Sequence, residues 1–157
     1  MNEMMRTEQD AGDGLSKQRL RAWLRILRAT RLIESELRDK LRVGHDSTLP
    51  RFDVLATLAR YPDGLRMSEV SSHLKVSNGN VTGIVERLVS EGLSERVSVE
   101  GDRRAMRVRL TEAGKTRFAA MAAEHEAWVD AILADFDADE LDTLISLLSR
   151  VKERAKP

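Results

Sequence analysis

The 157-residue chain contains no cysteine and few aromatic side chains, which make up only 4% of its residues. Without cysteine, disulfides, thiolate metal sites and cysteine nucleophiles are all excluded. Because aromatic residues are scarce, Leu, Val, Ile and Ala must build the core. Hydrophobic residues at 41% and charged residues at 33% are typical of a soluble globular protein. The length fits one compact domain with, at most, a short tail.

Long apolar runs are missing as well. The sequence has no stretch of about 18 apolar residues that could span a membrane. Residues 1–14 also lack the apolar segment of a signal peptide. We therefore expect a cytoplasmic protein that does not contact a membrane.

Residues suited to catalysis or metal binding are too few or wrongly spaced. His45, His73 and His125 lie far apart in the sequence, and no pair has the spacing of metal ligands. The acidic residues between 124 and 142 are interpreted as a solvated helical face, because they lack the glycine turn and terminal glutamate of a calcium loop. We predict that the protein is not an enzyme and has no metal or cofactor.

The formal net charge of +0 conceals separate basic and acidic segments. Residues 15–44 hold nine Lys or Arg against three Asp or Glu, and residues 96–117 hold seven against three. Residues 117–142 hold one basic and eight acidic residues. A folded chain of this kind presents separate surfaces, and the basic ones are suited to meet phosphate.

Hydrophobic periodicity predicts a mainly α-helical fold with one small β-hairpin. Residues 1–14 show no periodicity and are expected to form a disordered tail. Helices are expected over 15–44, 50–61, 68–74, 78–91, 112 to about 136, and from 139 onward. Between 96 and 110 the period changes to two, which predicts two strands around a charged loop at 100–104.

The order helix, turn, helix, hairpin is that of a winged helix-turn-helix, a DNA-binding fold. Its second helix, at 78–91, is expected to enter the major groove. Gly79 and Gly83 each cost up to about 1 kcal/mol in a helix relative to alanine, and a close approach of the backbone to DNA would compensate. Asn78-Gly79 could instead form a hairpin turn, but the apolar spacing that follows is helical.

The predicted DNA-binding residues combine the small polar face of this helix with the basic tip of the hairpin. A charged tip can also serve solubility alone, but beside a recognition helix it can reach phosphates or the minor groove. Within the tip, Asp102 is interpreted as an anchor or an arginine partner. The full set is Ser68, Ser77, Asn78, Gly79, Asn80, Thr82, Arg87, Asp102, Arg103 and Arg104.

The stretch from Gly64 to Gly114 resembles the MarR family of bacterial transcription regulators. The resemblance is carried by the family pattern Asp-x-Arg-x-x-x-Val-x-Leu-Thr, present here as Asp102, Arg104, Val108, Leu110 and Thr111. Arg66-Met67 departs from the leucine-threonine that is more usual in the family at this point. Residues 27–42, 48–58 and 76–88 look like the branch that controls breakdown of hydroxycinnamate-type aromatic compounds.

This resemblance implies a single MarR-type domain over 15–157, with dimerisation helices at 15–48 and 112–157 and a DNA-binding region at 49–111. It also implies a homodimer on a pseudo-palindromic operator, usually as a repressor that a small ligand releases. Amphipathic helices at both chain ends independently favour a dimer. The alternative is a winged helix that binds only another protein, without DNA.

One face of the first helix carries a row of basic residues: Lys17, Arg21, Arg25, Arg28 and, nearby, Arg31. A solvated face would explain the row, but acids usually relieve such repulsion, and the first acid after Asp13 is Glu34. The row therefore suits a phosphate or carboxylate. We predict that an anionic aromatic compound or an aryl acyl-CoA thioester binds at Trp23, Arg25, Arg28, His45, Arg51 and Phe52.

Overall fold

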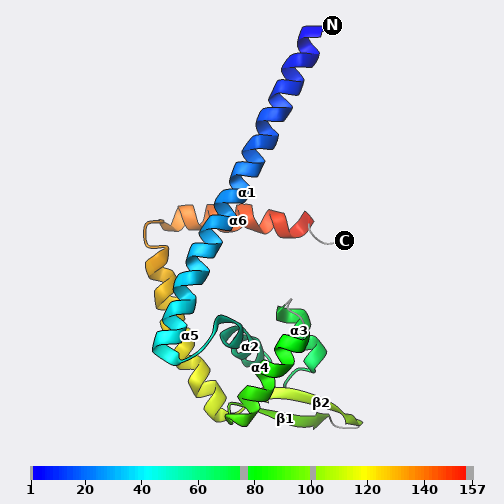
Figure 1. The fold of residues 1–157 in the computed structure, drawn as a ribbon, viewed down its shortest axis with the longest axis vertical. Coiled ribbons are helices and arrows are strands. Elements are labelled where there is room, and N and C mark those ends of the chain that lie inside the picture. The colour runs from blue at the N-terminus through cyan, green and yellow to red at the C-terminus, as the bar shows by residue number, and fades with distance from the viewer. Residues whose placement is uncertain (1, 75–77, 100–101, 155–157) are drawn as a thin grey trace. The chain divides into compact units, whose positions relative to one another are not determined.

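The computed structural model describes residues 2–74, 78–99 and 102–154, and the side chains of residues 14–74, 80–99 and 106–151. It confirms a mainly helical chain with one two-stranded antiparallel hairpin. Contacts divide it into two units, residues 1–49 and 50–157 (Figure 1). None of the described helices is long and apolar enough to cross a membrane.

The first unit is essentially one helix, α1 (Asn2–His45). It ends as predicted within one residue of Gly44, where Asp46 adopts a left-handed conformation (φ 46°). It begins at Asn2, however, whereas the sequence predicted a tail over 1–14. This segment contains Met, Glu, Gln and Ala, which favour helix, and an existing helix extends at the cost of fixing one residue per added hydrogen bond. Periodicity missed it because an apolar stripe is not required for that extension.

The core of the second unit comes from α2 (Leu49–Ala59), α3 (Met67–Leu74) and α4 (Asn78–Ser90) together with the hairpin. Their apolar residues recur at three- and four-residue spacing and face inward. Each such side chain contributes about 1.5–3 kcal/mol when fully buried. The completely or almost completely buried members are Val54, Leu55, Leu58, Val70, Val81, Val85, Leu88 and Val108.

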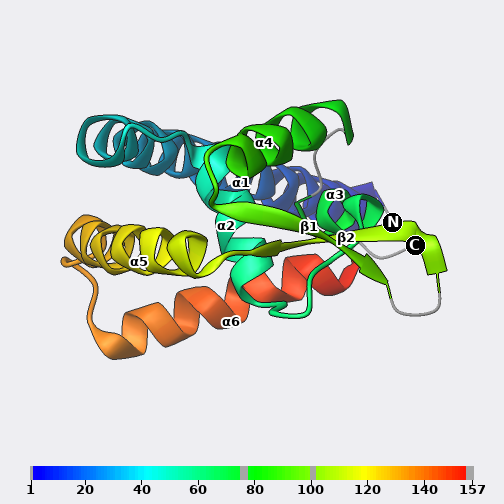
Figure 2. The ribbon, with the colours of Figure 1, turned by 90° about the horizontal axis from the view of Figure 1, so that it is seen from below.

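The hairpin consists of β1 (Ser94–Val99) and β2 (Asp102–Leu110), which lie side by side as a long ribbon in Figure 2. Leu65 pairs with Val108 through two backbone hydrogen bonds of 2.9 and 2.8 Å, so the segment before α3 forms a short bridge to β2. Gly64 makes this possible. Its φ is +84°, and a Cβ there would lie 2.9 Å from the carbonyl oxygen of Val108.

Two helices follow the hairpin, α5 (Glu112–Ile132) and α6 (Ala138–Arg154), and Figure 1 shows them running in different directions. α5 ends about four residues earlier than predicted. α6 begins one residue earlier than predicted, because Asp137 and Glu140 form a capping box: each side chain accepts a hydrogen bond from the other residue's backbone N–H, at 2.9 and 3.0 Å.

Candidate nucleic-acid interface

The helix-turn-helix consists of α3 and α4, with residues 75–77 outside the described part of the chain. α3 begins at Met67 because Glu69 Oε2 accepts a hydrogen bond of 2.7 Å from the Arg66 N–H, which secures the first turn. Ser68, predicted to contact DNA, therefore lies inside that turn, and its side chain is exposed.

The two faces of α4 differ sharply in burial. Val81, Val85 and Leu88 are fully buried. The opposite face is exposed and carries the predicted contacts Asn80, Thr82 and Arg87, together with Gly83. A Cβ at Gly83 would meet no atom within 4 Å, so nothing in the fold requires glycine there. The helix is thus anchored by its apolar side and presents a small polar surface outward.

Three further predicted contacts stand at the start of α4. Ser77 lies outside the described residues. Asn78 and Gly79 belong to the helix backbone, which rules out the alternative hairpin turn, but the side chain of Asn78 lies outside the described part.

The wing differs from its prediction at the tip. β2 already begins at Asp102, so Asp102, Arg103 and Arg104 belong to a strand rather than to a loop over 100–104. Their side chains are not among those described. Ser98 pairs with Met106 and Val99 with Asp102, so the register shifts there and β2 has extra residues. Such irregularities bend a strand, and alternation alone does not reveal them.

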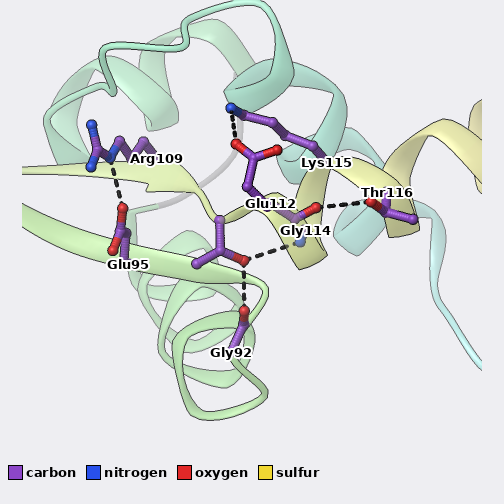
Figure 3. Close-up of polar contacts among 8 residues, drawn as sticks. Gly92, Glu95, Arg109, Glu112, Gly114, Lys115 and Thr116 are labelled. Atoms are coloured by element: carbon purple, nitrogen blue, oxygen red, sulfur yellow. Dashed lines mark hydrogen bonds and ion pairs between the residues drawn. The ribbon is translucent and has the colours of Figure 1, made fainter.

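The base of the wing is joined to α5 by a compact junction, drawn in Figure 3. Thr111 caps α5: its Oγ1 accepts from the Gly114 N–H at 3.0 Å and donates to the Gly92 carbonyl at 2.6 Å. Gly114 lies directly against Leu93, and a Cβ there would be 2.9 Å from the Leu93 carbonyl carbon and still nearer to its oxygen. The junction fixes the direction in which α5 leaves the wing.

Ion pairs neutralise part of the positive charge of the wing. Arg109 Nε donates to Glu95 Oε1 at 2.8 Å across the two strands (Figure 3). Arg96 lies 3.9 Å from Glu86 of α4. These two arginines are therefore partly neutralised within the fold, and the contacts predicted for Arg103 and Arg104 stay predictions, because their side chains are not among those described.

The predicted effector residues fall in both units. On α1, Trp23, Arg25 and Arg28 are exposed, whereas His45 is buried. At 1.5 Å per residue, about 33 Å of helix separates Trp23 from His45. One small ligand cannot contact both residues of a single α1, so the structure does not bring this set together.

The remaining two effector candidates have other contacts within the second unit. Phe52 is buried, and its ring stacks on His125 with the centroids 4.5 Å apart. Arg51 forms a bidentate ion pair with Glu91. Sequence reasoning missed this pair, because its members are forty positions apart and only the fold brings them together.

A cavity of about 680 Å³ lies between α5 and α6, and the sequence did not indicate it. Val129, Leu133 and Phe136 provide apolar walls, while Glu126 and Asp130 add carboxylates. These carboxylates would repel an anion, so charge does not favour this cavity as the site of an anionic aromatic effector.

Sequence comparison relates this chain to known regulators. A model of the MarR family matches residues 45–105, from the end of α1 into β2. The HTH-type transcriptional regulator PecS of Dickeya dadantii (strain 3937) is 32% identical over 130 residues, which cover 82% of this chain and 78% of PecS.

Solved structures agree with the sequence comparison. A MarR family transcriptional regulator from Silicibacter pomeroyi is 31% identical with a TM-score of 0.75, over 90% of this chain and 97% of that one. A mutant MarR from E. coli, complexed with operator DNA, is 27% identical with a TM-score of 0.71, over 80% of this chain and 89% of that one.

Proposed function

This chain belongs to the MarR family of DNA-binding transcription regulators, and on that basis we propose that it is a ligand-responsive repressor that binds a pseudo-palindromic operator as a homodimer. We propose further that its target genes encode the breakdown of aromatic compounds. The likeness to a MarR protein complexed with operator DNA supports the first part. The resemblance of residues 27–42, 48–58 and 76–88 to the hydroxycinnamate branch supports the second.

The observation that carries the DNA-binding assignment is the two-sided character of α4. Its apolar face is fully buried, while Asn80, Gly83 and Arg87 lie at intervals of three and four on the exposed face. An amide, an open glycine and a guanidinium at this spacing can together meet base edges and phosphates in the major groove.

The test is fluorescence anisotropy on DNA taken from upstream of the chain's own gene, at several salt concentrations. Arg104→Ala should weaken binding to all sequences and lower the salt slope by about one. Asn80→Ala should instead cost about 1–3 kcal/mol at particular base pairs. Ser146→Ala, at an exposed position of α6, is the control. Unchanged binding by both test variants would overturn the assignment of this surface.

The exposed apolar side chains of α6 support a homodimer. Leu144, Ile145, Leu147, Leu148 and Val151 are between 38% and 64% exposed in the single chain. Large contiguous apolar surfaces of this kind mark interfaces. The dimer should bind two half-sites about 10 bp apart, or a multiple of that distance.

For the effector we propose an anionic aromatic compound, free or as its CoA thioester, held by Arg25 and Arg28 of α1. These side chains are exposed, and no described acidic side chain pairs with either arginine. A guanidinium row suits carboxylate or phosphate. Trp23, two residues before Arg25, lies on a different face of the helix and is not part of this proposed site.

The effector test is to titrate the protein–operator complex with hydroxycinnamates and with their CoA thioesters. Arg25→Ala and Arg28→Ala should raise the concentration needed for release. Arg19→Ala is the matched control, because Arg19 is an exposed arginine on the opposite face of the same helix. Release that is equally sensitive to all three substitutions would remove the basis for a specific row, as would release by neither ligand class.

A further inference from the structure

Arg51 and Glu91 join α2 to the end of the recognition helix α4. Both terminal nitrogens of Arg51 donate to the Glu91 carboxylate, one to each oxygen, and the Nη1–Oε1 distance is 2.9 Å. The Arg51 side chain is only 18% exposed, whereas that of Glu91 is 36% exposed. A fork of two parallel hydrogen bonds fixes the direction between the groups as well as the distance.

Each member of this pair stands at the helix end that its charge disfavours. Arg51 lies in the first turn of α2, near the positive end of that helix dipole. Glu91 follows the last residue of α4, near the negative end of the other dipole. Neither charge is therefore favoured by the dipole of its own helix, and the shortest ion pair given for Glu91 is the tertiary contact with Arg51.

The backbone around Glu91 is itself fixed, so a force on its side chain acts on the whole helix end. Leu93 N donates to the Leu88 carbonyl at 2.9 Å, and Gly92 N donates to the Val89 carbonyl at 3.0 Å. With Gly92 at φ +73°, this is a Schellman motif. The ion pair thus connects two rigid elements rather than two mobile loops.

The other basic neighbours of Glu91 interact with it less closely. Arg87 Nε lies 3.7 Å from Oε1, and the Arg87 side chain is 79% exposed. The hydrogen bonds from Arg51 are the main cause of a lowered Glu91 pKa, which partial burial opposes and the charges of Arg51, Arg87 and Arg117 reinforce.

We propose that Arg51 is a positioning residue that holds the carboxyl end of α4 against α2 through Glu91, and so sets the angle at which the recognition helix meets DNA. The proposal rests on the proposed function, in which the opposite end of α4 contacts base edges. A helix held at one end transmits any tilt to the other, where Asn80 lies. Arg51 acts through Glu91 and need not touch DNA.

The test combines operator binding with amide hydrogen exchange. Arg51→Gln and Glu91→Gln should each weaken operator binding about three- to tenfold. Because the two residues act as one pair, the double variant should bind no less tightly than the single variant with the lower affinity. The salt slope should stay at the wild-type value, because no phosphate contact is lost. Arg87→Gln is the control: it also touches Glu91, but as a predicted DNA contact it should lower the slope by about one.

The charge-swapped variant, with Arg51→Glu and Glu91→Arg together, tests the pair directly. It places each charge at the helix end that favours it, although Arg87 and Arg117 then face an arginine. Operator affinity should recover to within about threefold of wild type. If the glutamine variants do not fold, Arg51→Lys, which keeps the charge but not the fork, should give an intermediate loss.

Exchange in the DNA-free protein separates this proposal from the proposed function. Amides of α4 near Leu88 and Val89 should exchange faster in Arg51→Gln, while those of α5 stay unchanged. Unchanged exchange and unchanged affinity would overturn the positioning role. So would a lowered salt slope in Arg51→Gln, which would make Arg51 a phosphate contact, or a charge swap that binds no better than the single variants. If the wild-type protein failed to bind DNA, the exchange result would still decide whether Arg51 holds α4.

Discussion

The winged region from α2 to β2 differs from the terminal helices α1 and α6 in how many of its large apolar side chains are exposed. In the winged region, Tyr61 and Met106 are the large apolar side chains left exposed among those described. In α1 and α6 most of the large apolar side chains are exposed, among them Trp23 at 55% and Val151 at 64%. The winged region buries most of its own apolar side chains, whereas most of those on α1 and α6 are exposed in the single chain.

This difference shows that the amphipathic pattern of a helix predicts that its apolar face is covered, but not whether the same chain or another chain covers it. In α4 the partner is the rest of the winged region, which buries Val85 and Leu88 completely. In α6 the stripe of Leu144 and Leu148 is equally regular but remains exposed. We therefore expect substitutions in the winged region to change folding stability, and substitutions on α6 to change association.

The largest effect is expected at the junction within the winged fold. Gly114→Ala would place a Cβ against the Leu93 carbonyl, where backbone must move, so the free energy of unfolding should fall by at least about 3 kcal/mol. Urea unfolding measures this. Ala113→Gly, at an exposed neighbouring position, should cost about 1 kcal/mol at most. A loss of similar size in both variants would contradict the close packing of this junction.

Next in size is the effect of charge on the exposed stripe of α6. Leu144→Asp and Leu148→Asp should each weaken dimerisation by about 2 kcal/mol or more, since they place a carboxylate in an apolar interface. Sedimentation should then show monomers at concentrations where the wild type is dimeric. Ser146→Asp, on the opposite face, should leave the dimer intact. If the wild-type protein stayed monomeric over the whole micromolar range, the inference that a second copy covers the exposed stripe of α6 would be wrong.

A smaller effect, of opposite sign for folding and for binding, is expected at Gly83. A Cβ there meets open space, so Gly83→Ala should raise the free energy of unfolding by about 0.5–1 kcal/mol. If the backbone of α4 approaches DNA closely, the same substitution should lower operator affinity. Thermal unfolding and anisotropy on one preparation measure both. A stabilised variant with full affinity would show that the glycine has no role in DNA binding.

The smallest effect concerns pH. The Arg51 hydrogen bonds lower the Glu91 pKa in the folded state, so the pair stabilises the fold fully above the ordinary glutamate pKa of about 4.3. This contribution is lost as the pH falls through the lowered folded-state pKa. Because Glu91 is partly exposed, the contribution should be below about 1 kcal/mol. Between pH 7 and pH 3, Glu91→Gln should therefore lose slightly less stability than wild type, and an equal loss would argue against the pair.

The sequence was sufficient to predict the helices, the hairpin and their order along the chain. Periodicity located the helices of the winged region to within one or two residues, because inward-facing residues such as Val81 and Leu88 must recur with the helical turn. The helix expected from 112 begins at Glu112, where Thr111 caps it through a local interaction between neighbours in the chain. The family pattern in the wing then indicated the function.

Other features were beyond local patterns. The α1 segment before Leu15, the register shift in β2 and the early end of α5 follow from propensities and pairings that alternation does not record. The effector set did not come together because about 33 Å of helix separates Trp23 from His45, a distance that the helix predicted over 15–44 already implied and that the prediction of the site did not take into account.

What the sequence by itself determined is therefore the set of elements, the buried face of each and the family. What only the tertiary structure decided is which distant groups meet: Arg51 with Glu91, Leu65 with Val108, and Gly114 with Leu93. The physical reason is range. Helix periodicity and capping depend on residues within about one turn of each other, whereas an ion pair or a glycine contact between distant segments depends on how whole elements pack.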